Sequence, residues 1–537
     1  DEIRPGERSV AVGLEHVLLI MAAALLFALS FPNFLFPWGF GFLGFAALIP
    51  LFPVIHRARW WSVWAYGLLF AVGGFALHNY WLALFHPVAL TVVLAFRGPW
   101  FALLFPLLKL ADREFPRYGF LIQALLWTGW EFIGVQGFLG YSFGGLGYSQ
   151  YLFLPLLQLA SLTAVWGISC MVILPSAYVG NLLKNGRKGI RPFFRNTRGA
   201  AIGYAVLLTV VLVWGGAVRA LPEGISKLTV AAVQPNSDPW KGGTPVYEEN
   251  LTTLMALSRK ALLKDPQLLI WPETAVVPSL RLHSRMRYDQ ERYNRIVRPF
   301  FSFAAELNVP LLTGNNDREL AGRDARGGYL TDDYNAAVLL QGGEISAVYR
   351  KTHLVPFTEY FPYRDLFPGI YQWLLTEDTH FYTPGEDLNK DLVFSIPGAR
   401  FSALICFEDT FPAGPRRFTR AGAELLVNLT NDAWSESVVA EMQHFSLSVL
   451  RSVENRRSLV RATISGITAL IGPDGSILER IPPFGEDYLV GEVPLSRETT
   501  LAAAWGDWFA IAALCAAGAA LLAGFIIRVL KMRVKGN

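Results

Sequence analysis

The chain has 537 residues, of which 53% are hydrophobic and 17% are charged. This composition is too apolar for an ordinary soluble protein and too charged for a protein made only of membrane helices. The net charge of +4 lies mostly in short loops, so it bears on membrane topology rather than on nucleic-acid binding. The three cysteines, Cys170, Cys406 and Cys515, argue against a disulfide framework.

Apolar and polar stretches divide the chain into three predicted domains. Residues 1–220 consist mainly of long apolar runs, 221–505 have the composition of a soluble α/β domain, and 506–537 hold a last apolar run and a basic tail. A membrane span needs roughly 20 apolar residues. We predict eight spans, at 17–31, 36–55, 60–83, 87–110, 118–139, 155–183, 200–219 and 508–527. The first is not expected to be a cleavable signal peptide, because no small-residue cleavage site follows it.

Basic residues alternate from one loop to the next. Lys and Arg occur before the first span and after the second, fourth, sixth and eighth, whereas the short loops 31–36, 83–87 and 140–154 contain none. The positive-inside rule then predicts that both termini are cytoplasmic. Residues 221–505 are expected on the opposite side of the membrane, which in a bacterium is the periplasm or the cell exterior.

Two charged residues, Arg97 and Glu131, fall inside predicted spans. Charge is costly in a membrane, so each is a candidate functional residue. The alternative, which we favour, is that the span breaks at 97–99 and lines a wet cavity, with Glu131 hydrogen-bonded internally. The glycine-rich loop Gly140–Ser149 has neither the preceding strand nor the following lysine of a phosphate-binding loop.

The polar stretch alternates predicted strands with predicted helices. Strands are predicted at 227–233, 268–271, 309–313, 336–340, 345–349, 401–405, 424–428, 458–464 and 468–471, and helices at 247–264, 292–307, 412–421 and 439–456. The glycine pair at 342–343 predicts a hairpin between two of these strands. The pattern indicates one α/β domain large enough for a substantial core.

Cys406 stands where an apolar strand is predicted to run into a polar turn. Strand ends of this kind hold nucleophiles in α/β enzymes. Taken alone, however, Cys406 is better explained as a small buried core residue, because free cysteine is among the most buried residue types.

Three further stretches carry polar residues where a strand is predicted to end. These residues are Glu273, Lys351, Glu359, Asn431 and Trp434. Each stretch alone also fits a helix cap, a surface ion pair or an Asx-rich turn. Together with Cys406 they supply the parts of covalent acyl transfer, in which a base activates a thiol and a cation stabilises an oxyanion.

Glu273 can serve as the base, and Lys351 with the backbone N–H of Phe407 can stabilise the oxyanion. Histidine is the usual partner of a catalytic cysteine. His353 and His444 are present, but neither has a clear orienting carboxylate in the sequence.

Four spaced motifs then form a recognisable set. They are Trp271-Pro-Glu273, Lys351-x-His-Leu-Val-Pro-Phe-x-Glu359, Cys406-Phe-Glu408 and Asn428-x-x-Asn-Asp-x-Trp434. Together they resemble the Glu-Lys-Cys pattern of the nitrilase superfamily of carbon–nitrogen hydrolases, in the version found in the apolipoprotein N-acyltransferase family. Seven spans before the domain and one after it resemble that family too, so the resemblance covers essentially the whole chain.

The resemblance implies an eight-span α-helical membrane bundle joined to a nitrilase-like α-β-β-α sandwich. It implies that Glu273 is the general base, Cys406 the nucleophile and Lys351 the oxyanion donor. The residues that it implies as supporting or substrate-binding groups are Glu359, Glu408, Phe407, Trp240, Asn431 and Trp434.

The resemblance also implies the reaction and its setting. An acyl chain, expected to be the sn-1 chain of phosphatidylethanolamine, passes through a cysteine thioester to the N-terminal amine of diacylglyceryl-cysteine lipoproteins in the bacterial inner membrane. The expected partners are this phospholipid, the diacylated apolipoprotein and membrane lipids, without nucleic acid, and the enzyme is expected to be a monomer. No metal or dissociable cofactor is expected, because no Cys/His cluster has ligand spacing.

The sequence departs from the family pattern at three places. Phe407 stands where a tyrosine is also found, Ser435-Glu436-Ser437 replaces the usual Phe-Gly after Trp434, and Thr463-Ile-Ser-Gly466 replaces a turn of the Asn-Thr-Gly type. None of these departures removes a catalytic atom.

The segment Tyr360–Tyr382 is rich in apolar and aromatic residues. Beside a bilayer it predicts an interfacial lid, whereas in a soluble enzyme it would be a loop that covers the core. Two rival functions remain open for the chain. One is a membrane-tethered amidase or nitrilase with the same triad, and the other is a non-enzymatic transporter or receptor with Arg97 and Glu131 along its path.

Overall fold

The computed structural model describes residues 5–85, 87–184, 186–220, 226–237, 242–287, 289–323, 329–376, 381–385 and 393–535. The chain forms two compact units. Unit 1 comprises residues 1–221, 442–450 and 505–537, and unit 2 comprises 222–441 and 451–504. The middle of one long helix, α17 (Val438–Asn455), therefore belongs to unit 1 while its two ends belong to unit 2.

All the secondary-structure elements in the described part of unit 1 are helical. Its elements are α1 (Pro5–Ser30), η1 (Gly41–Phe45), α2 (Leu51–Arg57), α3 (Val63–His78), α4 (Trp81–Phe85), α5 (Pro87–Glu114), α6 (Gly119–Ile133), η2 (Leu146–Gln150), α7 (Leu154–Leu157), α8 (Ala160–Thr163), α9 (Val165–Leu183), α10 (Gly186–Arg219) and α19 (Trp508–Lys535). Among the described residues, five helices are long and apolar enough to cross a membrane: α1, α5, α9, α10 and α19.

Four of the eight predicted spans correspond to shorter or interrupted elements. The prediction at 155–183 covers the short helices α7 and α8 as well as α9. The apolar helices α3 and α6 have 16 and 15 residues. The prediction at 36–55 corresponds to η1 and the seven-residue α2 instead of one continuous helix. The expected break at 97–99 is wrong, because α5 continues through Pro99 and Pro106. Several apolar helices are thus observed, and the count of eight is not.

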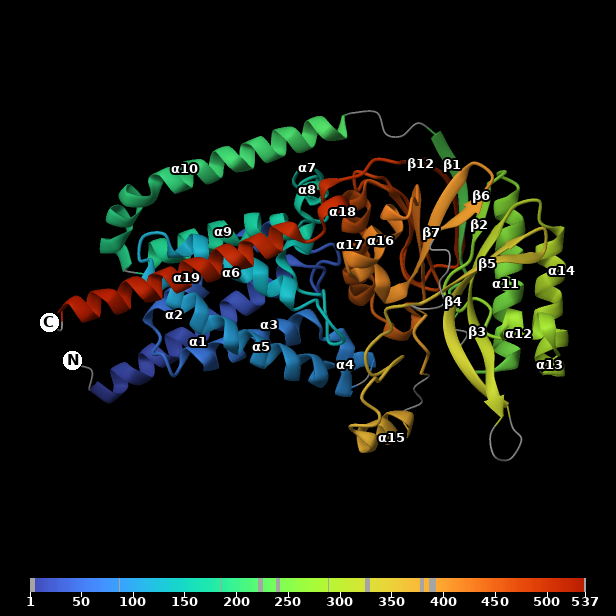
Figure 1. Cartoon of the computed structure of the whole chain (residues 1–537), viewed down its shortest axis with the longest axis horizontal. Coiled ribbons are helices and arrows are strands. Elements are labelled where there is room, and N and C mark those ends of the chain that lie inside the picture. Colours follow the sequence, from blue (N-terminus) through green and yellow to red (C-terminus); the bar gives the residue numbers. More distant parts are fainter. Residues whose placement is uncertain are drawn as a thin grey trace. The chain divides into compact units, whose positions relative to one another are not determined.

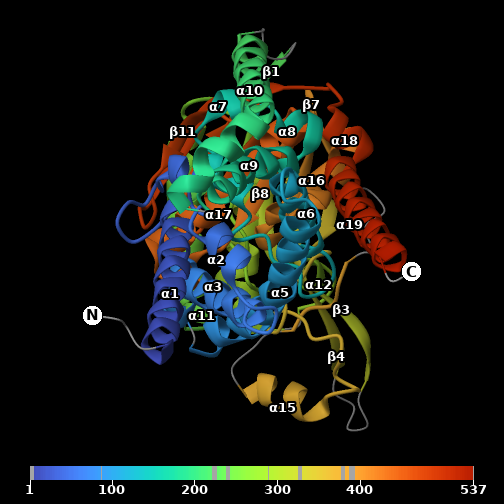
Figure 2. The same ribbon diagram turned by 90° about the vertical axis from the view of Figure 1, so that its left-hand side faces the viewer.

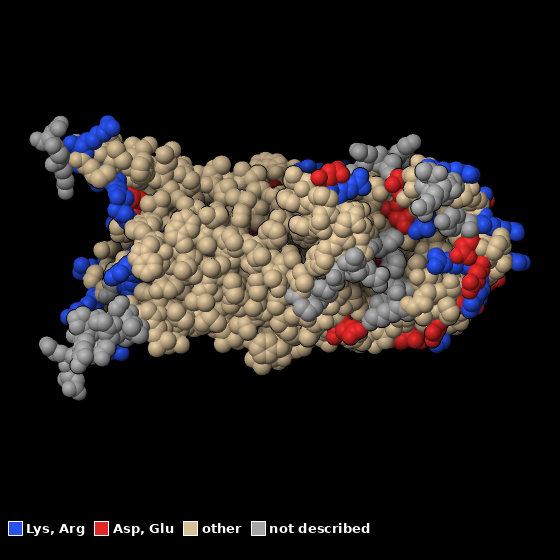
Figure 3. Space-filling model, turned by 90° about the horizontal axis from the view of Figure 1, so that it is seen from below, with Lys and Arg blue, Asp and Glu red and all other residues tan. Residues whose placement is uncertain are grey.

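The predicted basic loops meet one another in unit 1. Asp112, at the end of α5, accepts a hydrogen bond from Lys184 and pairs with His56. Arg528 of α19 pairs with Glu114 at 3.0 Å. On the face shown in Figure 3, the helices of unit 1 present a broad surface without charged side chains, and Lys and Arg gather at its left-hand end. Charge confined to the end of an apolar bundle is typical of membrane helices.

Unit 2 contains two six-stranded mixed sheets. One has the order β12-β1-β2-β3-β4-β5 and the other β11-β10-β9-β8-β7-β6. The strands are β1 (Ser226–Gln234), β2 (Leu268–Ile270), β3 (Leu311–Arg323), β4 (Tyr329–Gln341), β5 (Glu344–Arg350), β6 (Phe394–Ile396), β7 (Ala399–Ile405), β8 (Leu425–Thr430), β9 (Ser458–Thr463), β10 (Thr468–Ile471), β11 (Ile477–Ile481) and β12 (Asp487–Leu495). The central strands β1–β3 and β7–β9 are parallel, which explains their nearly continuous apolar sequences.

Helices cover the outer faces of both sheets (Figure 1). The helices of unit 2 are α11 (Thr244–Leu262), α12 (Leu280–Arg285), α13 (Gln290–Arg292), the π-helical turn η3 (Tyr293–Val297), α14 (Arg298–Glu306), α15 (Pro368–Thr376), η5 (Cys406–Thr410), α16 (Ala413–Arg420), η6 (Ala433–Ser435) and the ends of α17, with α18 (Leu501–Trp505) at the boundary with unit 1. Apolar side chains of α11 and α14 pack on β1–β4, and α16 contacts β7. Contacts between β1 and β9 complete an α-β-β-α arrangement.

The structure confirms every predicted strand and helix of this domain and adds three strands. The predicted hairpin is present, with positive φ at Gly342 (60°) and Gly343 (79°), which only glycine adopts without strain. The unpredicted strands β6, β11 and β12 lie at the sheet edges. Figures 1 and 2 show α15, from the apolar segment Tyr360–Tyr382, projecting away from the two sheets.

Candidate active site

The candidate site is built where four strands of unit 2 end. Glu273 follows β2, Lys351 follows β5, Cys406 follows β7 and Asn431 follows β8. The carboxyl ends of parallel strands share one edge of a sheet, and ligand sites of α/β folds gather there. The local pattern of an apolar run followed by a polar residue therefore places each side chain at the rim of a sheet.

Glu273 is held by hydrogen bonds to both carboxylate oxygens. Asn335 Nδ2 donates to Oε1 at 2.7 Å, and the backbone N–H of Asn431 donates to Oε2 at 2.6 Å. The loop that carries it lies against Gly314 of β3, where an added Cβ would come within 2.5 Å of the Glu273 Cα. Trp271, fully buried and stacked on Phe303, anchors the strand that precedes this loop.

Lys351 lies between two carboxylates. Its Nζ is 2.8 Å from Glu359 Oε2 and 3.7 Å from Glu273 Oε1. Glu359 is fixed in turn by the backbone N–H of Val355 at 2.8 Å, and Asn335 also donates to it at 3.3 Å. Lys351 is only 1% exposed, so the two carboxylates are its counterions.

Cys406 adopts a strained backbone conformation, with φ of 49°. For a residue with a Cβ this left-handed region costs energy and is typical of functional positions. The Asn428 side chain donates to the Cys406 carbonyl at 3.1 Å and helps to hold this conformation. Thr274 and Phe357, close in sequence to Glu273 and Glu359, also have positive φ.

Burial and charge set the protonation states of the three central groups. Burial, followed by the charge of Glu273, raises the pKa of the Cys406 thiol well above its usual range, so the resting group is a thiol. Burial also raises the pKa of Glu273, with Lys351 opposing and Glu359 adding to the shift. Burial opposes the charge of Lys351, but Glu359 and Glu273 outweigh it and raise its pKa, so Lys351 stays cationic.

Glu408 organises the segment between β5 and the nucleophile. Its Oε1 accepts hydrogen bonds from the Tyr349 hydroxyl at 2.8 Å and from the Thr352 N–H at 2.8 Å, and its Oε2 accepts from the Ile405 N–H at 2.9 Å. These contacts tie the Lys351 loop to the end of β7. Glu408 is therefore a positioning group two residues from Cys406.

The remaining predicted residues are placed as follows. Phe407 is the second residue of η5, a position at which the backbone N–H has no intrahelical acceptor. Trp434 lies in η6, partly exposed. Trp240 lies outside the described residues. His353 stacks on Phe411 with ring centroids 4.1 Å apart, and His444 belongs to unit 1.

Two features of the site were missed from the sequence. Asn335, which bridges the two carboxylates, lies in β4 one residue before the predicted strand. Its only signal was an amide beside a long apolar run. The second feature is a buried network in which Arg461 pairs with Asp409 at 3.0 Å and with Asp432 at 2.6 Å.

The buried network extends to Glu441 and to the turn at Gly466. Burial and the charge of Asp432 raise the pKa of Glu441 well above its usual range. A protonated Glu441 can share its proton with Asp432, the neighbour of the Asn431 N–H that holds Glu273. Gly466, in the unusual turn, leaves room for both carboxyl groups, since an added Cβ would come within 2.5 Å of Glu441 Oε2.

The site contains the thiol of Cys406, the carboxylate of Glu273 with its raised pKa, and the permanent cation of Lys351. The charges of these groups act on one another. A carboxylate of this kind can take a proton from a thiol and return it to a leaving group. A buried cation can stabilise the oxyanion of a tetrahedral intermediate. The geometry therefore fits covalent acyl chemistry at a carbonyl carbon.

Comparison with known proteins decides the family. The profile of the apolipoprotein N-acyltransferase N-terminal domain matches residues 23–178, and that of carbon-nitrogen hydrolases matches residues 229–503. The apolipoprotein N-acyltransferase 1 of Treponema pallidum is 38% identical over 97% of this chain and 98% of its own length. The chain belongs to the apolipoprotein N-acyltransferase family.

Other relatives agree with this assignment. The apolipoprotein N-acyltransferase 1 of Treponema denticola is 36% identical over 92% of this chain and 94% of its own length. The apolipoprotein N-acyltransferase of Geobacter metallireducens is 32% identical over 96% of each chain. Family membership makes the chain an acyltransferase with a nitrilase-like α/β domain and several membrane-spanning helices. A non-enzymatic transporter or receptor is thereby set aside, and the amidase alternative is the less supported of the two enzymes.

Proposed function

We propose that the chain transfers an acyl chain from a phospholipid, through a thioester on Cys406, to the N-terminal amine of a diacylglyceryl-cysteine lipoprotein. The donor proposed is the sn-1 ester of phosphatidylethanolamine. The observation that carries the mechanism is the buried group in which Lys351 lies 3.7 Å from Glu273 and both are coupled to Cys406. The names of the relatives support the lipoprotein acceptor.

In the first half-reaction, the sulfur of Cys406 attacks the ester carbonyl while Glu273 takes the thiol proton. A carbon–sulfur bond forms and the carbonyl oxygen becomes an oxyanion, which Lys351 and the Phe407 N–H stabilise. The carbon–oxygen bond then breaks, and Glu273 returns the proton to the leaving alkoxide. The products are a lysophospholipid and the thioester.

In the second half-reaction, the amine of the lipoprotein attacks the thioester carbonyl. A carbon–nitrogen bond forms, the carbon–sulfur bond breaks, and the amine proton passes by way of Glu273 to the departing sulfur. Because Glu359, Asn335 and Asn431 hold Lys351 and Glu273 in fixed positions, the same donors serve both half-reactions. In this scheme Glu359 and Glu408 position the site, and Trp434 and Trp240 contact substrate.

The proposed setting is the bacterial inner membrane, with eight spans, cytoplasmic termini and residues 221–505 in the periplasm. The meeting of basic loops at one end of unit 1 supports the orientation. The segment Tyr360–Tyr382 is proposed as an interfacial lid, in which Phe361 and Leu374 are buried. The side chains of Phe367, Ile370, Trp373 and Leu375 are 43–47% exposed, as an interfacial element requires.

The alternative is a membrane-tethered amidase that uses the same three residues to hydrolyse a carbon–nitrogen bond. It requires no lipid substrate, so it predicts hydrolysis of soluble amides and no acyl adduct from phospholipid. The similarity to acyltransferases over nearly the whole chain, membrane part included, favours the proposed transfer.

Mass spectrometry of the full chain reconstituted with phosphatidylethanolamine tests the proposal. We expect the intact mass to increase by one acyl chain, and the adduct to disappear when a diacylated lipopeptide is added. Cys406→Ser serves as the matched control and is expected to show no hydroxylamine-sensitive thioester. Turnover of lipopeptide by a chain that never carries the adduct would contradict the mechanism.

A further inference from the structure

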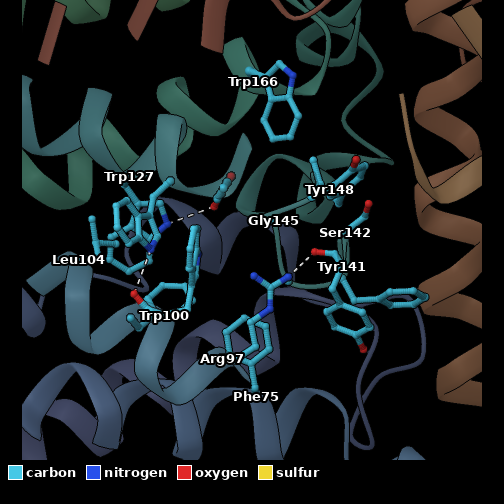
Figure 4. A pocket seen from close by; sticks show the side chains of 16 residues that line it. Phe75, Arg97, Trp100, Leu104, Trp127, Tyr141, Ser142, Gly145, Tyr148 and Trp166 are labelled. Carbon is cyan, nitrogen blue, oxygen red and sulfur yellow. Dashed lines mark hydrogen bonds between the residues drawn. The ribbon is translucent and has the colours of Figure 1, made fainter. Parts of the chain in front are cut away.

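The charged side chains inside the apolar helices of unit 1 are hydrogen-bonded to their neighbours. Glu131 accepts hydrogen bonds on one oxygen from Trp127 Nε1 at 3.1 Å and from the Leu146 N–H at 3.0 Å. Figure 4 draws the first of these as a dashed line, together with the bond that Arg97 donates to the Tyr141 carbonyl. These contacts hold both side chains within unit 1, whereas a glutamate of unit 2, Glu441, is arranged differently.

Glu441, near the start of α17, is fully buried and faces a second carboxyl group. Its Oε1 accepts a hydrogen bond from the Ser435 hydroxyl at 3.1 Å. Its Oε2 receives no hydrogen bond from the described residues. A Cβ placed on Gly466 would lie 2.5 Å from Glu441 Oε2 and 2.8 Å from Asp432 Oδ2. Two buried carboxyl oxygens therefore face each other beside one glycine.

The buried network around this contact holds more acidic groups than positive charges. Arg461 donates to Asp432 Oδ2 at 2.6 Å and pairs with Asp409 at 3.0 Å. Ionisation of Glu441 would add a further negative charge to a single buried guanidinium, which is costly. Burial and the charge of Asp432 raise the pKa of Glu441 well above its usual range, and the charge of Arg461 opposes this shift only in part. Glu441 is therefore the group that holds the proton.

A protonated Glu441 satisfies the polar atoms of this contact. Its carbonyl oxygen accepts the hydrogen bond from Ser435, and its hydroxyl donates to Asp432, which also accepts from Arg461. An ionised Glu441 would have no donor for its second oxygen, because a carboxylate only accepts hydrogen bonds. Buried polar atoms in native proteins are nearly always satisfied, so the geometry supports the carboxylic acid.

The contact lies one residue away from the group that orients the base. Asn431 directly precedes Asp432, and its backbone N–H donates to Glu273 Oε2 at 2.6 Å. The Ser435 N–H donates to the Asp432 carbonyl at 3.0 Å, so these two residues close one turn. Glu441 bonds to both ends of that turn, through the Ser435 hydroxyl and the Asp432 carboxylate.

We propose that Glu441 is a positioning residue of the acyl-transfer site and acts as a neutral carboxylic acid. Its hydroxyl donates to Asp432 and fixes the turn that keeps the Asn431 N–H on Glu273. Glu441 touches no substrate and keeps its proton throughout the reaction. The inference rests on the proposed role of Glu273 as the base, and it adds a residue that none of the four sequence motifs contains.

Thermal unfolding of two glutamine variants tests the protonation state. Glu441→Gln replaces the hydroxyl by an amide N–H that still donates to Asp432, so we expect the melting temperature to change little. The matched control is Glu454→Gln, on the same helix, where a buried glutamate pairs with Arg451 at 3.1 Å. Loss of this charge is expected to lower the melting temperature by several degrees. An equal loss in both variants would overturn the proposal, because it would show that Glu441 is ionised.

Steady-state rates of acyl transfer test the positioning role. Glu441→Gln is expected to keep kcat and KM, whereas Glu441→Met, which has no donor, is expected to lower kcat about tenfold and to leave KM unchanged. Glu248→Met, at an exposed glutamate of α11, is the control and should keep full activity. Equal loss of activity in the glutamine and methionine variants would overturn the proposal, since it would show that the negative charge is needed.

A double-mutant cycle shows whether Glu441 acts through Glu273. Single-turnover rates of Cys406 acylation are compared for Glu441→Met, Glu273→Gln and the double variant. In the Glu273→Gln background we expect Glu441→Met to have no further effect, because the group that it positions is already lost. A further loss of about tenfold there would overturn the proposal, since it would show a general structural defect.

The outcomes separate this inference from the proposed function. Full activity of Glu273→Gln would contradict the proposed base, whereas the two melting temperatures report the charge of Glu441 without any turnover. Normal formation of the Cys406 thioester together with an inactive Glu441→Gln would overturn the inference alone. If Glu441→Met does not fold, the activity and the melting temperature of Glu441→Gln still decide the question.

Discussion

Two groups of buried charge in this molecule differ in how completely they are hydrogen-bonded. In unit 2, both oxygens of Glu273 and of Glu359 accept hydrogen bonds, and Lys351 lies between them. In unit 1, Glu131 accepts hydrogen bonds from Trp127 and Leu146 on one oxygen, and its other oxygen receives none within 3.5 Å from the described residues.

The difference separates two kinds of function. Hydrogen bonds to both oxygens fix the orientation of each carboxylate, so the Cys406 site is pre-organised for proton transfer at fixed atoms. A buried charge that lacks part of its hydrogen bonds is rare in an apolar bundle and is a candidate functional residue. The following predictions test this contrast, beginning with the largest expected effect.

Removing the base should abolish most activity. Glu273→Gln keeps the shape of the side chain but cannot take the Cys406 proton, so we expect kcat/KM for acyl transfer to fall about a hundredfold to ten-thousandfold. Rates measured with a phospholipid donor and a lipopeptide acceptor check this. The exposed Glu248, which pairs with Arg295, provides the control variant Glu248→Gln, expected to keep full activity.

Removing the cation should destabilise the buried group formed by Lys351, Glu273 and Glu359. Lys351→Met leaves two buried carboxylates without their counterion, so we expect a loss of about 3–5 kcal/mol in stability. Thermal unfolding of the full chain measures this. Lys227→Met, which removes a lysine that is 61% exposed and paired with Glu492, is expected to change stability little. Equal effects of the two variants would show that Lys351 is not held by its neighbours.

Moving the base without changing its chemistry should have a smaller effect. In Gly314→Ala the new Cβ meets backbone atoms of Pro272, Glu273 and Thr274 at 2.5 Å. We expect a loss of about 1–3 kcal/mol in stability and about a hundredfold lower activity, because Glu273 is displaced. Gly203→Ala, at a glycine of α10 with open space around it, is the matched control and should change neither quantity.

The pH dependence should report the raised pKa of Glu273. Glu273 must be ionised to act as a base, so activity is lost as the pH falls through its pKa, which lies above the ordinary value of 4.5. The charge of Glu359 contributes to the shift, so Glu359→Gln is expected to move the acidic limb of kcat/KM to lower pH. An acidic limb that stays in place, or moves to higher pH, would show that the charge of Glu359 does not raise the pKa of Glu273.

The smallest effect is expected in unit 1. Glu131→Gln keeps an oxygen for the bonds from Trp127 and Leu146 and replaces an oxygen that receives none, so the melting temperature of the lipid-free chain should hardly change, by the equivalent of about 0.5 kcal/mol or less. A large loss of stability would show that the second oxygen is bonded, and would remove the contrast between the two groups.

The sequence by itself determined the α/β domain and the positions of its reactive residues. Apolar runs are local signals, and each of them ends where Glu273, Lys351, Cys406 or Asn431 begins a loop. The family motifs then indicated the chemistry of these residues. The lengths of the helices in unit 1 were harder to predict from the sequence. A run such as 36–55 is equally apolar whether it forms one helix or short pieces that pack against each other.

The tertiary structure alone decided how these residues are held. Asn335 in β4 and Arg461 in β9 lie within strands, where sequence pattern cannot tell a buried amide or guanidinium from an outward-facing one. The positive φ of Cys406 and the close approach of Gly314 to Glu273 depend on segments far apart in the chain. Hydrogen-bond saturation, which separates the two charged groups, is a property of three-dimensional contacts and has no local signature in the sequence.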